Sequence, residues 1–359
     1  MLAARTPADF TATAAKLGFS LVETVSLPRL DERVYRIRLP AGVSVPAGLA
    51  KLRQRFPRAL FDANHHFTLA QGMELPPSVA RASIGWERVP PDCGKGIRIG
   101  MIDAAIDVAH PALRGVDLHY RSFATPGRNS GSADHGTAIA ALLLGRPDAG
   151  RGWGGLLPGV HVAAAAIFEV NDRGKTVATA RALLQAVDWV VGQGVTVLNL
   201  SMAGPDNSLI RLATERALQQ GLVLVAAAGN GASATEHAYP AAYPDVIAVT
   251  AVSADGRVYP RANRGSYIDF AAPGVRLWTA VPSGGRFQSG TSFAAPYVTS
   301  MAALTLAESG ARTVEAVRSR LREDVLDLGA QGRDDVFGWG LVRMHPACRG
   351  NARAAFLDP

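Results

Sequence analysis

Beyond about residue 96, short and continuously apolar runs alternate with longer segments of helical periodicity. The runs predict strands at 97–103, 160–167, 195–200, 222–228 and 246–252, and the periodic segments predict helices at 136–144, 176–191, 207–219 and 292–307. Runs that are apolar throughout are typical of strands buried on both faces of a parallel sheet. The alternation therefore predicts an α/β fold, with a doubly wound, mostly parallel sheet and helices on both faces.

The first seventy residues follow a different order, helix–strand–strand–helix–strand. The predicted helices are 7–17 and 46–56, and the predicted strands are 19–27, 33–39 and 59–69. A stretch rich in Pro and Gly separates this region from the alternating one. The predicted organisation is a small α+β domain at 1–71, a linker at 72–96, a large domain at 97–346 and a C-terminal tail at 347–359.

Composition narrows the classes of protein that fit. Hydrophobic residues make up 48% of the chain and charged residues 19%, as in a well-buried globular protein. The net charge of +7 comes from scattered arginines without a basic run or interleaved aromatics, so we expect no nucleic-acid partner. No apolar run approaches 18 residues, which argues against a membrane span. The first ten residues, MLAARTPADF, lack the charged-then-apolar pattern of a signal peptide.

Three windows carry side chains suited to nucleophilic catalysis. They are IRIGMIDAAIDVAHPAL with Asp103, DHGTAIAALLLG with His135 and SGTSFAAPYVTSMAAL with Ser292. A serine hydroxyl becomes an effective nucleophile when an imidazole takes its proton and a carboxylate orients that imidazole. Asp103 ends a predicted strand, where catalytic groups of open α/β sheets gather. Ser292 opens a predicted helix, whose first N–H groups favour negative charge.

Each of these residues also has an ordinary structural interpretation when it is taken singly. An aspartate after a strand is commonly a cap or turn residue, and a lone histidine is commonly a half-buried structural one. A serine before a helix is commonly an N-cap, and an asparagine after a strand, such as Asn230, commonly forms a turn. Their joint order and local contexts favour catalysis.

The three windows, with AAAGN at 226–230 and FGWGLV at 337–342, resemble the subtilisin-like serine proteases over about residues 82–345. The resemblance implies a serine endopeptidase that hydrolyses peptide bonds. Its implied residues are a triad of Asp103, His135 and Ser292 and an oxyanion hole of the Asn230 amide and the Ser292 backbone N–H. No organic cofactor is required, because nucleophile, base and electrostatic stabiliser are all protein groups.

The N-terminal domain looks like the inhibitory pro-domain of this family, a small ferredoxin-like fold, but without its first strand. The resemblance implies a self-cleaving zymogen whose tail occupies the active site until it is cut, between about residues 68 and 82. The missing strand leads us to expect that the chain begins late, with an exporting signal lost upstream. By family resemblance, the protein is expected in the periplasm or outside the cell. The alternative is an accessory or interaction domain.

The resemblance also implies how a polypeptide substrate binds. Two extended segments would flank the peptide like neighbouring strands, with a third segment as the floor of the primary pocket. The segments are Ser201, Met202 and Ala203; Ala226, Ala227, Ala228 and Gly229; and Ala238, Tyr239 and Pro240. Because the floor carries no charge, we expect apolar or medium-sized residues before the scissile bond. Ala203 stands where the family usually has Gly, which predicts a narrower entrance.

Two features concern metals and redox state. Ala112 stands where the family often has a calcium-binding Asp, and the loop at 150–159 is poor in oxygen ligands. Because calcium takes six to eight oxygens, the main calcium site of the family is expected to be absent, and calcium elsewhere stays open. Cys93 and Cys348 flank the catalytic region, either as a disulfide or as two free thiols. They do not resemble a metal site.

Two alternatives to hydrolysis stay open. The first is a catalytically silent scaffold that binds peptides in the same cleft. Loss of a triad residue would favour this interpretation, and all three residues are present in the sequence. A transpeptidase or macrocyclase would use the same triad and differ in how it excludes water. The expected partners are polypeptide substrates and the N-terminal domain of the same chain. The protein is expected to be a monomer.

Overall fold

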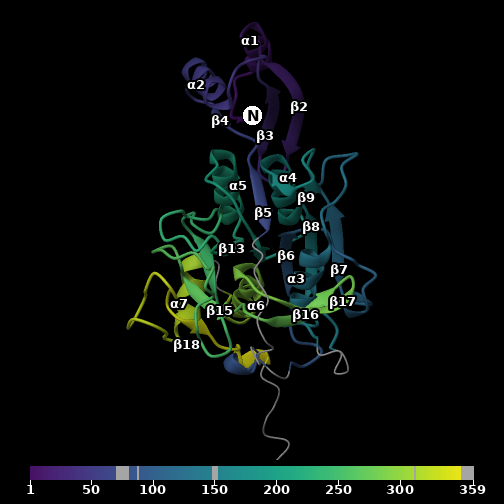
Figure 1. Cartoon of the computed structure of the whole chain (residues 1–359), viewed down its shortest axis with the longest axis vertical. Helices are drawn as coiled ribbons and strands as arrows, with labels where there is room; N and C mark the ends of the chain where they lie inside the picture. The colour runs from purple at the N-terminus through teal and green to yellow at the C-terminus, as the bar shows by residue number, and fades with distance from the viewer. Residues whose placement is uncertain (70–80, 87–88, 148–152, 311–312, 349–359) are drawn as a thin grey trace, which may run out of the picture.

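The large domain is built on one twisted, mostly parallel sheet (Figure 1). The computed structural model describes residues 1–69, 81–86, 89–147, 153–310 and 313–348. The sheet order is β18-β19-β15-β14-β13-β11-β6-β8-β7, and its neighbours are parallel except for β18 and β19. Its strands are β6 Arg98–Asp103, β7 Leu118–Ser122, β8 His161–Ala166, β11 Val197–Leu200, β13 Val223–Ala227, β14 Val246–Val252, β15 Phe270–Pro273, β18 Val325–Leu326 and β19 Leu341–Val342.

Helices cover both faces of this sheet, which confirms the predicted doubly wound α/β fold. One face packs against α3 Asp134–Leu144, α6 Thr291–Ser309 and α7 Val314–Arg322, and the other against α4 Ala180–Val191 and α5 Ser208–Gln219. Along β13 the side chains alternate between two cores: Val223 and Val225 join one, and Leu224 and Ala226 join the other. Burial on both faces is the reason that these strands are apolar throughout.

One predicted helix is wrong at its start. Residues Thr176–Thr179 form a strand, β10, antiparallel to β9 Phe168–Val170, and α4 begins only at Ala180. The hydroxyl of Thr179 caps that helix by accepting from the N–H of Ala182 at 3.2 Å. The β-branched residues of β10 and the turn before it, with Gly174 at φ 69°, favour a hairpin over a helix.

The N-terminal domain is a four-stranded antiparallel sheet of order β2-β3-β1-β4 with two helices, the ferredoxin-like arrangement (Figure 1). Its elements are β1 Leu2–Ala4, α1 Phe10–Lys16, β2 Ser20–Leu27, β3 Glu32–Arg38, α2 Val45–Arg55 and β4 Leu60–Asp62. The prediction that the first strand is missing is therefore wrong. Strand β1 is only three residues long, too short to show periodicity, yet it pairs with both β3 and β4. Because β1 is present, a missing first strand no longer supports the expectation that the chain begins late.

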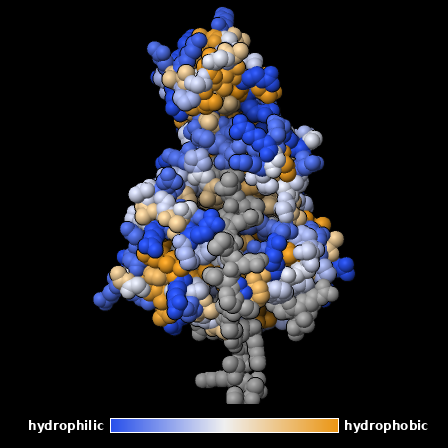
Figure 2. Space-filling view, viewed as in Figure 1, coloured by the Kyte–Doolittle hydropathy of each residue, from blue (hydrophilic) through white to orange (hydrophobic). Residues whose placement is uncertain are grey.

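The N-terminal domain rests on α4 and α5 of the large domain (Figure 1). Leu2, Leu27 and Leu30 share one apolar core with residues of those two helices. The domain also caps both helices: Asn64 Oδ1 accepts from the second N–H of α4 at 2.9 Å, and Asp62 Oδ2 accepts from the first N–H of α5 at 2.7 Å. Hydrophilic side chains surround the junction on the face seen in Figure 2. An apolar centre with a charged rim thus holds the two domains together.

The shortest ion pair of that rim, between Arg181 and Glu23, predicts a pH dependence of stability. Arg181 donates twice to Glu23, both at 2.6 Å, and this bonding lowers the pKa of Glu23 below its ordinary 4.5. A carboxylate whose pKa is lowered in the folded state contributes stability above its unfolded pKa and loses it as the pH falls through the folded one. The melting temperature of Glu23→Gln should therefore lie below that of the wild type above pH 5. The difference should shrink as the pH falls below 4.5 and vanish once the pH lies below the lowered pKa of Glu23 in the folded state.

The matched control is Asp172→Asn, which breaks a surface pair between Arg128 and an Asp172 side chain that is 86% exposed. Solvent screens such a pair, so melting curves should differ little from wild type at any pH. A deficit of Glu23→Gln that grows in acid would contradict the assignment.

Cys93 and Cys348 form a disulfide, with their Cα atoms 5.7 Å apart. Near it, the N–H of Met344 donates to the carbonyl of Ile84 at 2.9 Å. The two ends of the large domain are thus held side by side, and Cys348 belongs with this domain although the predicted tail began at residue 347. The rest of that tail, 349–359, lies outside the described residues, as does much of the predicted linker.

Candidate active site

Asp103, His135 and Ser292 come together at the carboxyl end of β6 and the N-termini of α3 and α6. Nδ1 of His135 lies 2.6 Å from Oδ1 of Asp103, and Nε2 lies 3.0 Å from Oγ of Ser292. The side chains of Asp103 and His135 are each only 1% exposed. A carboxylate, an imidazole and a hydroxyl are therefore aligned in the order that activates a serine.

Glycine next to His135 makes this approach possible. A Cβ on Gly136 would lie 2.4 Å from the carbonyl oxygens of both Ala104 and Ala105, in the loop that follows β6. Without a side chain there, the first turn of α3 sits directly against the end of that strand. The N–H of Ala104 also donates to Oδ1 of Asp103 at 2.6 Å, which fixes the carboxylate. The sequence His-Gly thus sets the distance between imidazole and carboxylate.

Asn230 follows β13 and is oriented by the residue before Ser292. Its Oδ1 accepts from the backbone N–H of Thr291 at 3.1 Å and from the Thr291 hydroxyl at 3.0 Å. Its Nδ2 is buried and has no hydrogen-bond partner among the described residues. A buried donor left without an acceptor costs about 1–3 kcal/mol. Such an unpaired amide beside the serine suits an acceptor that arrives with a ligand.

A strand from the N-terminal domain lies between two strands near the triad. The predicted strand 59–69 is in fact two, β4 and β5 His66–Leu69, and β5 extends from the N-terminal domain to the large one (Figure 1). It pairs antiparallel with β12 Met202–Ala203, with Leu69 opposite Met202. Its other neighbour is β10, with Phe67 opposite Ala178. An extended segment of the chain is thus held by backbone pairing on both sides.

The second neighbour of β5 is thus β10 and not the segment 226–229, and the expectation that 226–229 flanks a substrate stays a prediction. Ala227 lies inside the main sheet, in β13. The N–H of Ala228 donates to the carbonyl of Val249 at 2.9 Å, and its own carbonyl accepts from the Tyr267 hydroxyl at 2.7 Å. Its backbone is already paired within the domain. The strand that was missed is β10; the turn at 171–174 between β-branched runs was its signal in the sequence.

The other sequence-predicted binding residues gather near β12. A Cβ on Gly229, whose φ is 99°, would lie 2.8 Å from the Cβ of Ala238, so these two residues are direct neighbours. Tyr239 exchanges two backbone hydrogen bonds with Gly204, the residue after β12. The Ser201 side chain points to the serine instead: its hydroxyl donates to the Ser292 carbonyl at 3.0 Å.

In the described ranges, no three His, Cys, Asp or Glu side chains form a group that could hold a metal ion. Ala112 offers no side-chain oxygen, and residues 150–152 of the loop named above lie outside the described part. The expected absence of the family's main calcium site stays a prediction, and no chemical step is assigned to a metal.

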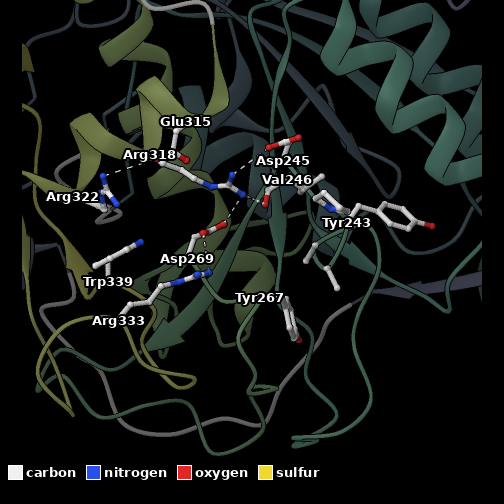
Figure 3. Close-up of a pocket in the computed structure, with 13 residues that line it drawn as sticks. Tyr243, Asp245, Val246, Tyr267, Asp269, Glu315, Arg318, Arg322, Arg333 and Trp339 are labelled. Atoms are coloured by element: carbon white, nitrogen blue, oxygen red, sulfur yellow. Dashed lines mark hydrogen bonds and ion pairs between the residues drawn. The ribbon is translucent and has the colours of Figure 1, made fainter.

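A cavity of about 430 Å³ contains none of the predicted site residues (Figure 3). Arg318 donates to Asp269 at 3.2 Å and to the carbonyl of Val246 at 2.9 Å, and Arg333 lies 3.3 Å from the other Asp269 oxygen. Burial raises the pKa of Asp269, and the two guanidiniums oppose that effect. Arg318 also lies 3.7 Å from Asp245, and Arg322 lies 4.0 Å from Glu315. The three guanidiniums and three carboxylates that line the cavity therefore balance in charge, and Arg318 ties α7 to the sheet.

The chain is similar to known proteins in both sequence and fold. A model of the subtilase family matches residues 94–340, and the chain belongs to that family, as the three windows predicted. The chain is 31% identical over 264 residues to the minor extracellular protease Epr of Bacillus subtilis (strain 168), covering 73% of this chain and 40% of Epr. It is 31% identical over 265 residues to subtilisin amylosacchariticus of Bacillus subtilis subsp. amylosacchariticus, covering 71% and 66%. It thus spans less than two thirds of either relative.

The crystal structure of fervidolysin from Fervidobacterium pennivorans, a keratinolytic enzyme related to subtilisin, superimposes with a TM-score of 0.74. The match covers 97% of this chain and 60% of that one at 21% identity, which shows a shared fold. Within the described residues, no helix combines the length and apolarity needed to cross a membrane.

Proposed function

We propose that this chain is a serine endopeptidase that hydrolyses peptide bonds. The observation that carries the proposal is the position of His135, 2.6 Å from Asp103 and 3.0 Å from Ser292. Ser292 Oγ attacks the peptide carbonyl carbon while His135 Nε2 takes its proton, and Asp103 holds the imidazole. The C–N bond then breaks as His135 gives that proton to the leaving amine. Water repeats the sequence on the acyl-enzyme and releases the acid.

The oxyanion of each tetrahedral intermediate would accept from Asn230 Nδ2 and from the backbone N–H of Ser292. The unpartnered Nδ2 supports this role. Thr291 donates to the amide oxygen of Asn230, so the amide nitrogen is the group left to donate to the oxyanion. Donors fixed before the reaction need no reorganisation as charge develops. No organic cofactor and no metal enters the mechanism.

For Asn230→Ala we expect kcat to fall by about 10²–10³, the loss known for removal of the matching donor in a subtilisin. KM should change little, since the oxyanion exists only beyond the ground state. Steady-state kinetics on a chromogenic peptide would test this. A fall in kcat of less than threefold would remove Asn230 from the oxyanion hole.

Substrates are proposed to be extended polypeptides that pair as β5 does. Strands β12 and β10 would supply backbone hydrogen bonds, which bind a peptide without demanding a sequence. Gly229 and Ala238 would form an uncharged pocket wall that suits apolar or medium-sized residues. The N-terminal domain would then be a pro-domain, whose β5 blocks the substrate position until the chain cuts itself. We further propose a monomeric, exported protein; Epr, a relative, is named extracellular.

Labelling with a fluorophosphonate tests the proposal. The reagent reacts with an activated serine, so the wild type should gain one label on the peptide that contains Ser292. His135→Ala should label at least a thousandfold more slowly, because the base is gone. A wild type that binds peptides and does not label would be a silent scaffold. Release of only ligated or cyclic products from peptide substrates would indicate a transpeptidase.

A further inference from the structure

The carbonyl of Ser292 receives a hydrogen bond from outside its own helix. In a regular α-helix this carbonyl would accept from the N–H four residues on, at position 296. Pro296 has no N–H, and a proline ring inside a helix presses on the carbonyl four residues before it. The hydroxyl of Ser201 donates to this same carbonyl at 3.0 Å. A side chain from the β11–β12 connection thus supplies a donor where the proline removes one.

Two further side chains orient the Ser201 hydroxyl. Nδ2 of Asn199 donates to Ser201 Oγ at 2.9 Å, and the Thr299 hydroxyl donates to Asn199 Oδ1 at 2.9 Å. The four residues of this network, Ser292 included, are all 0% exposed. Because Asn199 occupies a lone pair of the Ser201 oxygen, the hydroxyl hydrogen is left to point at Ser292. The network starts and ends on α6 and passes through β11, so it ties the nucleophile to the sheet.

We propose that Ser201 is a positioning residue for the nucleophile, an inference that rests on the proposed endopeptidase function. Ser201 directly precedes β12, the strand against which β5 pairs. Its bond to the Ser292 carbonyl fixes the nucleophile relative to any peptide aligned on that strand. Ser201 would act through the Ser292 backbone and not through the reacting atoms. Because a misplacement of about 1 Å costs about 10²-fold in rate, loss of one such bond should cost about tenfold.

The primary test is Ser201→Ala, assayed with a chromogenic tetrapeptide well below the melting temperature. We expect kcat to fall about tenfold, KM to stay within twofold, and the rate of fluorophosphonate labelling to fall by the same factor as kcat. A purely structural hydroxyl would lower the melting temperature and leave all three values unchanged.

A second substitution makes the test specific. Pro296→Ala returns an N–H to position 296, where it can donate to the Ser292 carbonyl within the helix. In the Ser201→Ala background it should restore most of the lost kcat. If Ser201→Ala does not fold, Thr299→Val breaks the same network further from the nucleophile and should lower kcat about threefold. The matched control is Thr305→Val, which removes a buried hydroxyl of α6 that has no partner among the described residues and should leave kcat unchanged.

The outcomes separate the two proposals. Wild-type kcat in Ser201→Ala, or failure of Pro296→Ala to restore it, would overturn the positioning role and leave the endopeptidase proposal standing. Equal effects of Thr299→Val and Thr305→Val would also overturn it. A wild type that neither cleaves nor labels would overturn both.

Discussion

Replacing Ser292 with alanine should lower kcat on a peptide substrate by about 10⁶, the loss that the matching change causes in a subtilisin. The imidazole of His135, 3.0 Å away, would have no hydroxyl to deprotonate, and no acyl-enzyme could form. Because this variant cannot cut itself, β5 also stays between β12 and β10 and keeps the proposed substrate position occupied. The measurement is kcat and KM on a chromogenic tetrapeptide, with active-site titration of the wild type.

Ser300→Ala is the matched control for that change. Ser300 is also a fully buried serine of α6, and its hydroxyl has no hydrogen-bond partner among the described residues. Its loss should leave kcat within twofold of wild type. If both variants lost activity equally, the cause would be disruption of the helix and not removal of the nucleophile.

Replacing Asp103 with asparagine should lower kcat by about 10⁴, as in other proteases with this triad. The carboxylate lies 2.6 Å from Nδ1 of His135 and stabilises the imidazolium that forms when Ser292 loses its proton. An amide of the same shape either turns its NH₂ toward the ring, which favours the wrong tautomer, or offers a neutral oxygen. The rate of fluorophosphonate labelling should fall in parallel with kcat.

Asp107→Asn provides a control in the loop that directly follows Asp103. The Asp107 carboxylate accepts from the N–H of Ala109 at 3.1 Å, an interaction that does not involve the triad. We expect kcat within twofold of wild type for this variant. An Asp103→Asn enzyme with more than a tenth of wild-type kcat would contradict the role of Asp103 in holding the imidazole.

The candidate triad could be predicted from the sequence because each of its residues sits in a motif that also dictates local structure. Asp103 ends a buried strand, Gly136 lets α3 approach that strand, and Ser292 lies in the first turn of a long buried helix. The five predicted strands of the large sheet could also be recognised in the sequence. Burial on both faces makes such strands continuous runs of apolar residues. At these sites the local sequence motif determines both the secondary structure and the position of the residue in the fold.

The elements that escaped prediction depend on partners far away in the chain. Strand β1 has three residues, and its place in the sheet comes from pairing with β3 and β4, more than thirty residues away. Strand β10 directly precedes the amphipathic helix α4, and the sequence pattern assigns both to one predicted helix at 176–191. The pairing of β5 with β12 joins residues 69 and 202, which no periodicity reveals. Non-local pairing of short strands therefore limits what sequence alone can predict.

Intact-mass spectrometry of the purified chain, incubated beside Ser292→Ala, tests the central claim most directly. If Ser292 is the nucleophile and the N-terminal domain is a pro-domain, the wild type should split between about residues 68 and 82 while the variant keeps its full mass. Cleavage of both chains at the same position and rate would contradict the claim.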